Sequence, residues 1–227
     1  MPLFPNAPWT TFYGNTPAKL VYPEQTMYQM LRETALKYPE NTAYVFMGKK
    51  TSYTAFLKRI EAAARGLAAM GIRKGDRVTI CMPNTPQALD CFYALNRIGA
   101  IPNMIHPLSA AKEIAFYLNF SKSKAILTLD QFYYKVASIL PELDNPCTIL
   151  VAKVQDELPF PLKTLYPISK NARAVKKLPA SGYTLWTDMV RKGSSTALPE
   201  DSGKWDDCGA ILYSGGTTGT TKGIQLS

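Results

Sequence analysis

The 227-residue sequence contains one histidine, His106, and four widely separated cysteines, Cys81, Cys91, Cys147 and Cys208. No two cysteines form a CxxC pair, so the sequence gives no support for a zinc ribbon or a thioredoxin-type redox site. A histidine that acts as a general base needs a partner to orient it, and His106 stands before Pro107 with no such partner nearby. We therefore interpret His106 as a turn residue.

The sequence also lacks a long apolar run and a secretory signal. Its most apolar region, residues 91–108, is interrupted by Asn96, Arg97 and His106, so we do not expect it to cross a bilayer. Residues 1–6 have neither the basic start nor the apolar core of a signal peptide. Three of the cysteines lie in apolar contexts and are interpreted as buried thiols, which fits a reducing cytosol. We expect a cytoplasmic protein, with membrane association left open.

Acidic residues are few compared with basic ones: 17 Asp and Glu stand against 26 Lys and Arg, which gives a formal net charge of +9. This excess could favour a phosphate-rich ligand, an anionic membrane or a nucleic acid, or it could be a generic basic surface. Because the sequence has no long Lys/Arg block and no RNA-binding signature, we expect no nucleic-acid partner. Asp206 and Asp207 could bind Mg²⁺, but we interpret them as solvated acids and predict no metal ligands in this chain.

Short apolar segments alternate with amphipathic ones along residues 54–151. Strands are predicted at residues 78–82, 125–129 and 147–151 and from residue 100 onward, and helices are predicted to begin at Thr26, Thr54, Thr85, Ser109 and Asp130. A hairpin is expected around Gly48-Lys49. Alternating strands and helices, with strands that are continuously apolar, predict an α/β fold: a doubly wound, mostly parallel sheet with helices on both faces.

The composition divides the chain into four segments. Residues 1–53 form an arm, a helix and a hairpin, and the proline-rich residues 1–25 are expected to wrap the surface. Residues 54–151 form the sheet subdomain, residues 152–205 are a basic, proline-rich excursion, and residues 206–227 hold a strand and a glycine-rich loop. Within the excursion, residues 160–177 interleave cations with apolar side chains, which permits contact with an anionic membrane. A surface excursion between two strands, with a short helix at residues 186–191, is the favoured interpretation.

The loop near the end of the chain carries the chemistry. An apolar strand at residues 210–213 leads into glycines, hydroxyls and one lysine. Glycines let a ligand approach the backbone, and consecutive N–H groups form an anion-binding nest. A hairpin turn or flexible connector is the alternative, but the hydroxyls and the lysine favour a polyphosphate. The predicted ATP-phosphate-binding residues are Ser214, Gly215, Gly216, Thr217, Thr218, Gly219, Thr220, Thr221 and Lys222.

This loop differs from a Walker A motif, because Lys222 follows Thr221 and precedes Gly223. Residues 213–223 instead resemble the signature loop of the adenylate-forming (AMP-binding) superfamily, which includes acyl-CoA synthetases. Gly215 stands where that pattern usually has serine, and Thr221 where it has proline; these changes remove a hydroxyl and a fixed φ. Segments 51–53, 71–78, 83–84 and 97–102 resemble the blocks that precede the loop in acyl-CoA synthetases, in the same order.

The resemblance implies an ATP-dependent acyl-CoA synthetase that uses ATP with Mg²⁺ and coenzyme A, and whose carboxylic acid substrate is a fatty acid. It also implies that this chain is the N-terminal part of such an enzyme, without the catalytic residues and inactive by itself. Two alternatives stay open: an enzyme that adenylates amino acids or aryl acids, and a non-catalytic phosphate- or membrane-binding module. The oligomeric state is not determined by the sequence, and a homodimer is one possibility.

Overall fold

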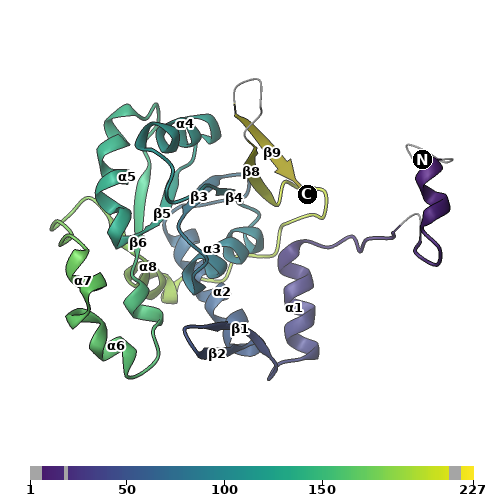
Figure 1. Cartoon of the computed structure of the whole chain (residues 1–227), viewed down its shortest axis with the longest axis horizontal. Coiled ribbons are helices and arrows are strands. Elements are labelled where there is room, and N and C mark those ends of the chain that lie inside the picture. Colours follow the sequence, from purple (N-terminus) through teal and green to yellow (C-terminus); the bar gives the residue numbers. More distant parts are fainter. Residues whose placement is uncertain (1–6, 18–19, 215–220) are drawn as a thin grey trace.

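The computed structural model describes residues 7–17, 20–214 and 221–227. Among these residues, seven strands form one sheet, and a separate two-stranded hairpin precedes it (Figure 1). The sheet contains β3 (Arg77–Cys81), β4 (Ile101–Met104), β5 (Ala125–Leu129), β6 (Thr148–Ala152), β7 (Thr184–Leu185), β8 (Ala210–Ser214) and β9 (Lys222–Leu226). Their spatial order is β7-β6-β5-β3-β4-β8-β9, and neighbouring strands are parallel except for the antiparallel pair β8–β9. The predicted mostly parallel sheet is confirmed.

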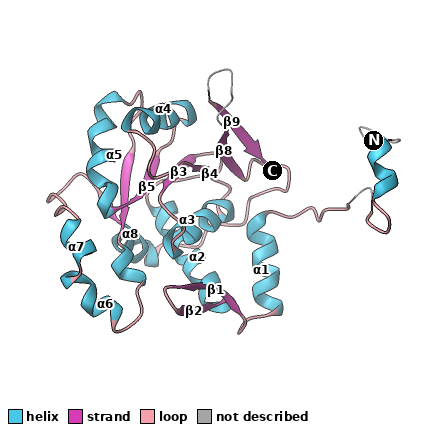
Figure 2. Ribbon diagram, in the orientation of Figure 1, coloured by secondary structure: helices cyan, strands magenta, loops and turns pink. Residues whose placement is uncertain are grey.

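Helices cover both faces of this sheet (Figure 2). The longer helices are α1 (Met27–Lys37), α2 (Tyr53–Ala69), α3 (Pro86–Arg97), α4 (Ala111–Ser121), α5 (Tyr133–Ile139) and α8 (Trp186–Lys192). Leu127 and Leu150 point into the core formed with α1, α2, α3 and α8, whereas their neighbours Ile126 and Ile149 point into the core formed with α4 and α5. Because both faces are buried, the strands carry apolar residues at consecutive positions.

Short polar caps decide where the first helices begin. The hydroxyl of Thr26 accepts a hydrogen bond from the Gln29 backbone N–H at 3.2 Å, and the Gln29 side chain accepts one from the Thr26 N–H at 2.9 Å, which forms a capping box at α1. Thr85 caps α3 through the Ala88 N–H, and Pro86 occupies the first turn. The predicted starts at Thr26 and Thr85 are therefore confirmed.

Two other predicted helix starts were wrong by one or two residues, and the start predicted at Asp130 is a 3-10 turn, η2 (Asp130–Phe132), that precedes α5. Helix α2 is capped by Ser52, whose Oγ accepts from the Ala55 N–H at 3.3 Å, while the hydroxyl of Thr54 donates to the Pro39 carbonyl. Helix α4 begins after Ala110. The backbone N–H of Ala110 donates to Glu113 Oε2 at 3.0 Å, and Ser109 does not cap the helix. In both places the predicted capping residue was a serine or threonine close to the observed boundary. The free N–H group at the start of the helix is satisfied instead by Ser52 in α2 and by Glu113 in α4.

The hairpin predicted around Gly48-Lys49 is present as β1 (Thr42–Phe46) paired with β2 (Lys49–Ser52). The segment at residues 152–205 is more structured than the sequence indicated: it contains α6 (Leu162–Leu165), α7 (Lys170–Ala174), β7 and α8. Strand β7 pairs with β6 at the sheet edge, and α8 packs against α2. At the other end of the chain, the 3-10 turn η1 (Pro8–Phe12) stands apart from the sheet, so the expectation that residues 1–25 wrap the surface was wrong for this turn.

Within the described residues, no helix is both long enough and apolar enough to cross a membrane.

Candidate nucleotide-phosphate site

Strands β8 and β9 form the stem of a hairpin whose tip is the predicted phosphate loop. Tyr213 pairs with Gly223, and Ser214 pairs with Lys222. Residues Gly215, Gly216, Thr217, Thr218, Gly219 and Thr220 lie outside the described residues. The two ends of the motif are therefore in the antiparallel ladder that the hairpin alternative requires, whereas phosphate binding by residues 215–220 stays a prediction. The structure brings Ser214 and Lys222 directly opposite each other across the stem.

Strand β8 runs parallel to β4, so it ends at Ser214 on the edge of the sheet where open α/β sheets bind ligands. Lys222 is exposed at the start of β9, and Thr221 immediately precedes it. An exposed ammonium group beside a glycine-rich turn is available to a polyanion.

Aromatic side chains from α4 hold the stem in place. The Tyr213 ring lies 4.3 Å from that of Tyr117 and 6.3 Å from that of Phe120, measured between centroids. A Cβ atom on Gly223 would lie 2.9 Å from Cε1 of Phe120, which is closer than a real Cβ contact. Gly223 thus has a packing reason to be glycine: its lack of a side chain lets β9 lie close beside α4.

A buried polar cluster connects strands β3 and β4 with the end of α4, next to β8. Asn103 Nδ2 donates to Thr79 Oγ1 at 2.8 Å and to Ser121 Oγ at 3.1 Å, and the hydroxyl of Ser123 lies 2.8 Å from those of Thr79 and Ser121. Asn103 is also the β4 residue in register with Ile211 of β8. Sequence reasoning missed this cluster, although polar residues at the centre of predicted buried strands were a signal for it.

The remaining candidate residues take structural roles. His106 Nδ1 accepts a hydrogen bond from the Leu108 N–H at 3.2 Å, which fits the turn interpretation. Asp207 accepts from the Lys204 N–H and forms an ion pair with Lys74 at 2.8 Å, and these contacts lower the pKa of Asp207. Across the part of the chain that the structure describes, no group of three or more His, Cys, Asp or Glu side chains is placed to hold a metal ion.

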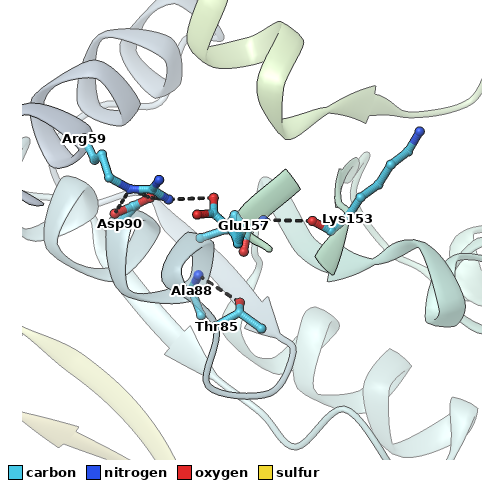
Figure 3. Close-up of polar contacts among 7 residues, drawn as sticks. Arg59, Thr85, Ala88, Asp90, Lys153 and Glu157 are labelled. Carbon is cyan, nitrogen blue, oxygen red and sulfur yellow. Dashed lines mark hydrogen bonds and ion pairs between the residues drawn. The ribbon is translucent and has the colours of Figure 1, made fainter. Parts of the chain in front are cut away.

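The strongest charged cluster lies elsewhere, between α2, α3 and the 3-10 turn η4 (Val154–Glu157) (Figure 3). Arg59 donates from Nη2 to Asp90 at 2.6 Å and to Glu157 at 2.7 Å, and from Nε to Asp90 at 3.0 Å. Burial raises the pKa of Asp90 to about 6, although the hydrogen bonds from Arg59 oppose the shift. Nothing in the sequence pattern predicted this cluster.

The chain was compared with protein-family models, curated proteins and solved structures. The family model described as "AMP-binding enzyme" matches residues 31–227. A long-chain-fatty-acid–CoA ligase of Bacillus subtilis (strain 168) is 30% identical over 223 residues, which are 97% of this chain and 40% of that protein. A crotonobetaine/carnitine–CoA ligase of Salmonella paratyphi A is 27% identical over 208 residues, or 89% of this chain and 36% of that protein.

Solved structures show the same fold. The anthranilate CoA ligase AuaEII, solved with anthranoyl-AMP, superposes with a TM-score of 0.73 at 19% identity over 90% of this chain and 35% of that one. The N-terminal domain of FACL13 from Mycobacterium tuberculosis gives a TM-score of 0.65 at 25% identity over 89% of this chain and 44% of that one.

A mostly parallel α/β sheet with helices on both faces, together with the glycine- and threonine-rich sequence between β8 and β9, defines the class of protein. The family match over residues 31–227 makes the assignment specific: the chain belongs to the AMP-binding enzyme family. It spans about 40% of the length of the first curated relatives that it matches.

Proposed function

We propose that this chain is the N-terminal part of an ATP-dependent acyl-CoA synthetase that activates a fatty acid, and that it contains the loop that binds the phosphates of ATP. The observation that carries the proposal is the glycine-threonine loop with Lys222, placed at the carboxyl end of β8 in a chain of this family. The substrate class is supported by the 30% identity to a long-chain-fatty-acid–CoA ligase. The reaction joins a carboxylate to AMP with release of pyrophosphate, and then transfers the acyl group to the thiol of coenzyme A.

The loop acts on the leaving group in this reaction. When the carboxylate attacks the α-phosphorus, negative charge accumulates on the departing pyrophosphate and has to be stabilised. Backbone N–H groups of residues 215–219, the hydroxyls of Thr217 and Thr218, and the Lys222 ammonium supply the donors for the β- and γ-phosphates. Since the described residues offer no cluster of acids for Mg²⁺, we assign that ion no ligand among them.

Fatty acids partition into membranes, so the proposal includes peripheral contact of a cytoplasmic enzyme with an anionic bilayer through residues 160–177. It does not include nucleic acid, and it leaves the oligomeric state open.

Replacing Lys222 with alanine tests the loop. We expect the Kd of the 227-residue chain for pyrophosphate, measured by isothermal titration calorimetry, to rise about tenfold, because one charged donor to the phosphates is lost. Lys122→Ala, which removes an exposed lysine at the end of α4, is the control and should leave the Kd within about twofold. Equal pyrophosphate affinity of the Lys222→Ala chain and the unmodified chain would remove the proposed role of the lysine.

A further inference from the structure

One stretch of the chain has a strongly one-sided charge. Between Glu157 and Asp188 there is no acidic residue. The same stretch holds Lys163, Lys170, Arg173, Lys176 and Lys177. These cations lie within 15 consecutive residues, residues 163–177. Their positive charge is therefore concentrated in one short segment and is not spread evenly over the basic surface of the protein.

Large apolar side chains are exposed among these cations. Phe160 is 86% exposed, Ile168 65%, Leu165 50% and Leu162 43%. They come from α6, from the residues just before it, and from the 3-10 turn η5 (Tyr166–Ile168) that follows it. We name residues 160–177 the α6–α7 face. Exposed apolar side chains that alternate along the chain with cations are typical of a surface that meets a partner.

Two neighbouring cavities lie beneath this face. One, of about 470 Å³, has a mainly apolar lining that includes Met47, Val154, Leu158, Leu162 and Leu165. The other, of about 440 Å³, is lined by Lys153, Lys176, Lys177 and Asp130, and the two share Tyr166 and Val175 as a wall. The face therefore offers an apolar hollow beside a cation-lined one, which matches an amphiphile with an anionic head.

Both ends of the face are fixed to the folded body. At one end, Glu157 pairs with Arg59 of α2, and Gln87 Nε2 of α3 donates to the Lys153 carbonyl at 3.0 Å (Figure 3). At the other end, the hydroxyl of Tyr134 in α5 donates to the Lys177 carbonyl at 2.6 Å. Figure 1 shows α6 and α7 at the margin of the molecule, far from the β8–β9 hairpin. A partner on this face would not cover strands β8 and β9.

We propose that the α6–α7 face docks on a bilayer rich in anionic phospholipid. Phe160 and Ile168 enter the headgroup layer, while Lys163, Arg173, Lys176 and Lys177 meet the lipid phosphates. Asp130 shares a cavity lining with Lys153, Lys176 and Lys177, and Asp156 interacts electrostatically with Lys153 and Lys163, so these two acids oppose part of the positive charge of the face. This inference rests on the membrane contact in the proposed function and deepens it by assigning a role to each side chain of residues 160–177 that meets the lipid, and it is independent of nucleotide binding.

Vesicle sedimentation of the 227-residue chain tests the proposal. We expect the chain to pellet with phosphatidylcholine vesicles that contain about one third phosphatidylglycerol, and to stay mostly in solution with pure phosphatidylcholine. The double variant Lys176→Glu/Lys177→Glu should lower the partition coefficient by about tenfold or more, since each lysine near the surface contributes to binding. Phe160→Asp should lower it by a similar factor, because an acid replaces the most exposed aromatic side chain of the face.

Matched variants distinguish this face from general charge or hydrophobicity. Lys112→Glu/Lys122→Glu, in α4 and at the residue that follows it, changes the net charge equally, and Phe12→Asp replaces a phenylalanine that is 88% exposed on η1. Both should keep the partition coefficient within about twofold of that of the unmodified chain, and circular dichroism should show all variants folded. Equal losses in test and control variants, or equal pelleting with neutral vesicles, would overturn the proposal. Because Lys222→Ala should still pellet, failure of the phosphate loop can be told apart from failure of this face.

Discussion

Arg59 shows how one side chain can join distant parts of the chain. Its guanidinium group binds the carboxylate of Asp90 in α3 and that of Glu157 in η4, which are 31 and 98 positions away. Burial lowers the pKa of Arg59, but its hydrogen bonds with the two carboxylates outweigh burial and raise that pKa. The positive charge of Arg59 therefore balances the negative charges of two almost fully buried carboxylates. Through Glu157, it also links the chain just before the α6–α7 face to helices α2 and α3.

Arg59→Met should lower the free energy of unfolding by about 3 kcal/mol at pH 7, because it leaves two buried carboxylates without a cation. The loss should depend on pH. The pKa of Asp90, already about 6 in the native protein, rises further without Arg59. An acid with a raised native pKa loses stability as the pH rises from its unfolded pKa to its native pKa, so the extra loss in the variant falls above about pH 6. Urea unfolding should therefore show a smaller deficit at pH 5 than at pH 7.

Lys58→Met serves as the control, because Lys58 lies on the same helix with an exposed side chain. It should change the free energy of unfolding by no more than about 0.5 kcal/mol. A deficit of Arg59→Met that is equal at both pH values would mean that the carboxylates are not what the arginine compensates.

At the scale of elements, α2 and α8 approach each other closely at a pair of glycines. A Cβ atom on Gly193, which follows α8, would collide with the backbone of Gly66 in α2. A Cβ atom on Gly66 would meet the sulfur of Met189 and would lie 2.8 Å from the Met189 carbonyl oxygen. The absence of side chains thus lets α8 lie against α2 and keeps the residue 152–205 segment next to the sheet.

Gly66→Ala should lower the free energy of unfolding by about 1–3 kcal/mol through overpacking. The sign is informative, because alanine in place of glycine within an exposed helix would add about 0.5–1 kcal/mol of stability. Thermal or urea unfolding gives the measurement.

Met189→Ala supplies a test of the mechanism. The double variant Gly66→Ala/Met189→Ala should cost less than the sum of the two single losses, since truncation of Met189 frees part of the space that the new methyl group needs. Strictly additive losses would show that the helix contact is not the cause.

At the scale of the whole molecule, the sheet gives the hairpin its position. Strand β8 is the last parallel strand, and β9 pairs with it in the opposite direction at the edge. The family relatives are longer than this chain by more than a factor of two, since it spans about 40% of the first of them. Adenylation needs an acid held in line with the α-phosphorus as well as groups that bind the phosphates.

We expect the 227-residue chain by itself to bind pyrophosphate but to form no acyl-AMP from ATP and a long-chain fatty acid. This expectation rests on the premise that no group of this chain places the carboxylate, because the reaction then loses the large advantage of a fixed geometry. Fatty-acid-dependent exchange of radiolabelled pyrophosphate into ATP is the measurement. Exchange above the background of a protein-free control would contradict this account.

Periodicity and caps allowed much of the fold to be predicted. Strand β5 was predicted with its observed bounds, and α1 was predicted to run from its cap at Thr26 to Lys37. The cap of α2 was missed because Ser52 and Thr54 are both good capping residues, and only the approach of Pro39 decided between them. Of the candidate site, the sequence supplied the residues of the loop but not the antiparallel pairing of Ser214 with Lys222, which depends on the neighbouring strands.

The sequence by itself determined the alternation of strands and helices, because apolar spacing and capping residues act within a few positions of one another. It also determined the family, since the loop motif and the blocks before it are local patterns. Only the tertiary structure decided which charges meet, as in the pairing of Arg59 with Asp90 and Glu157, and which apolar residues stay exposed, as on the α6–α7 face. Those outcomes depend on contacts between residues far apart in the chain, which no local pattern encodes.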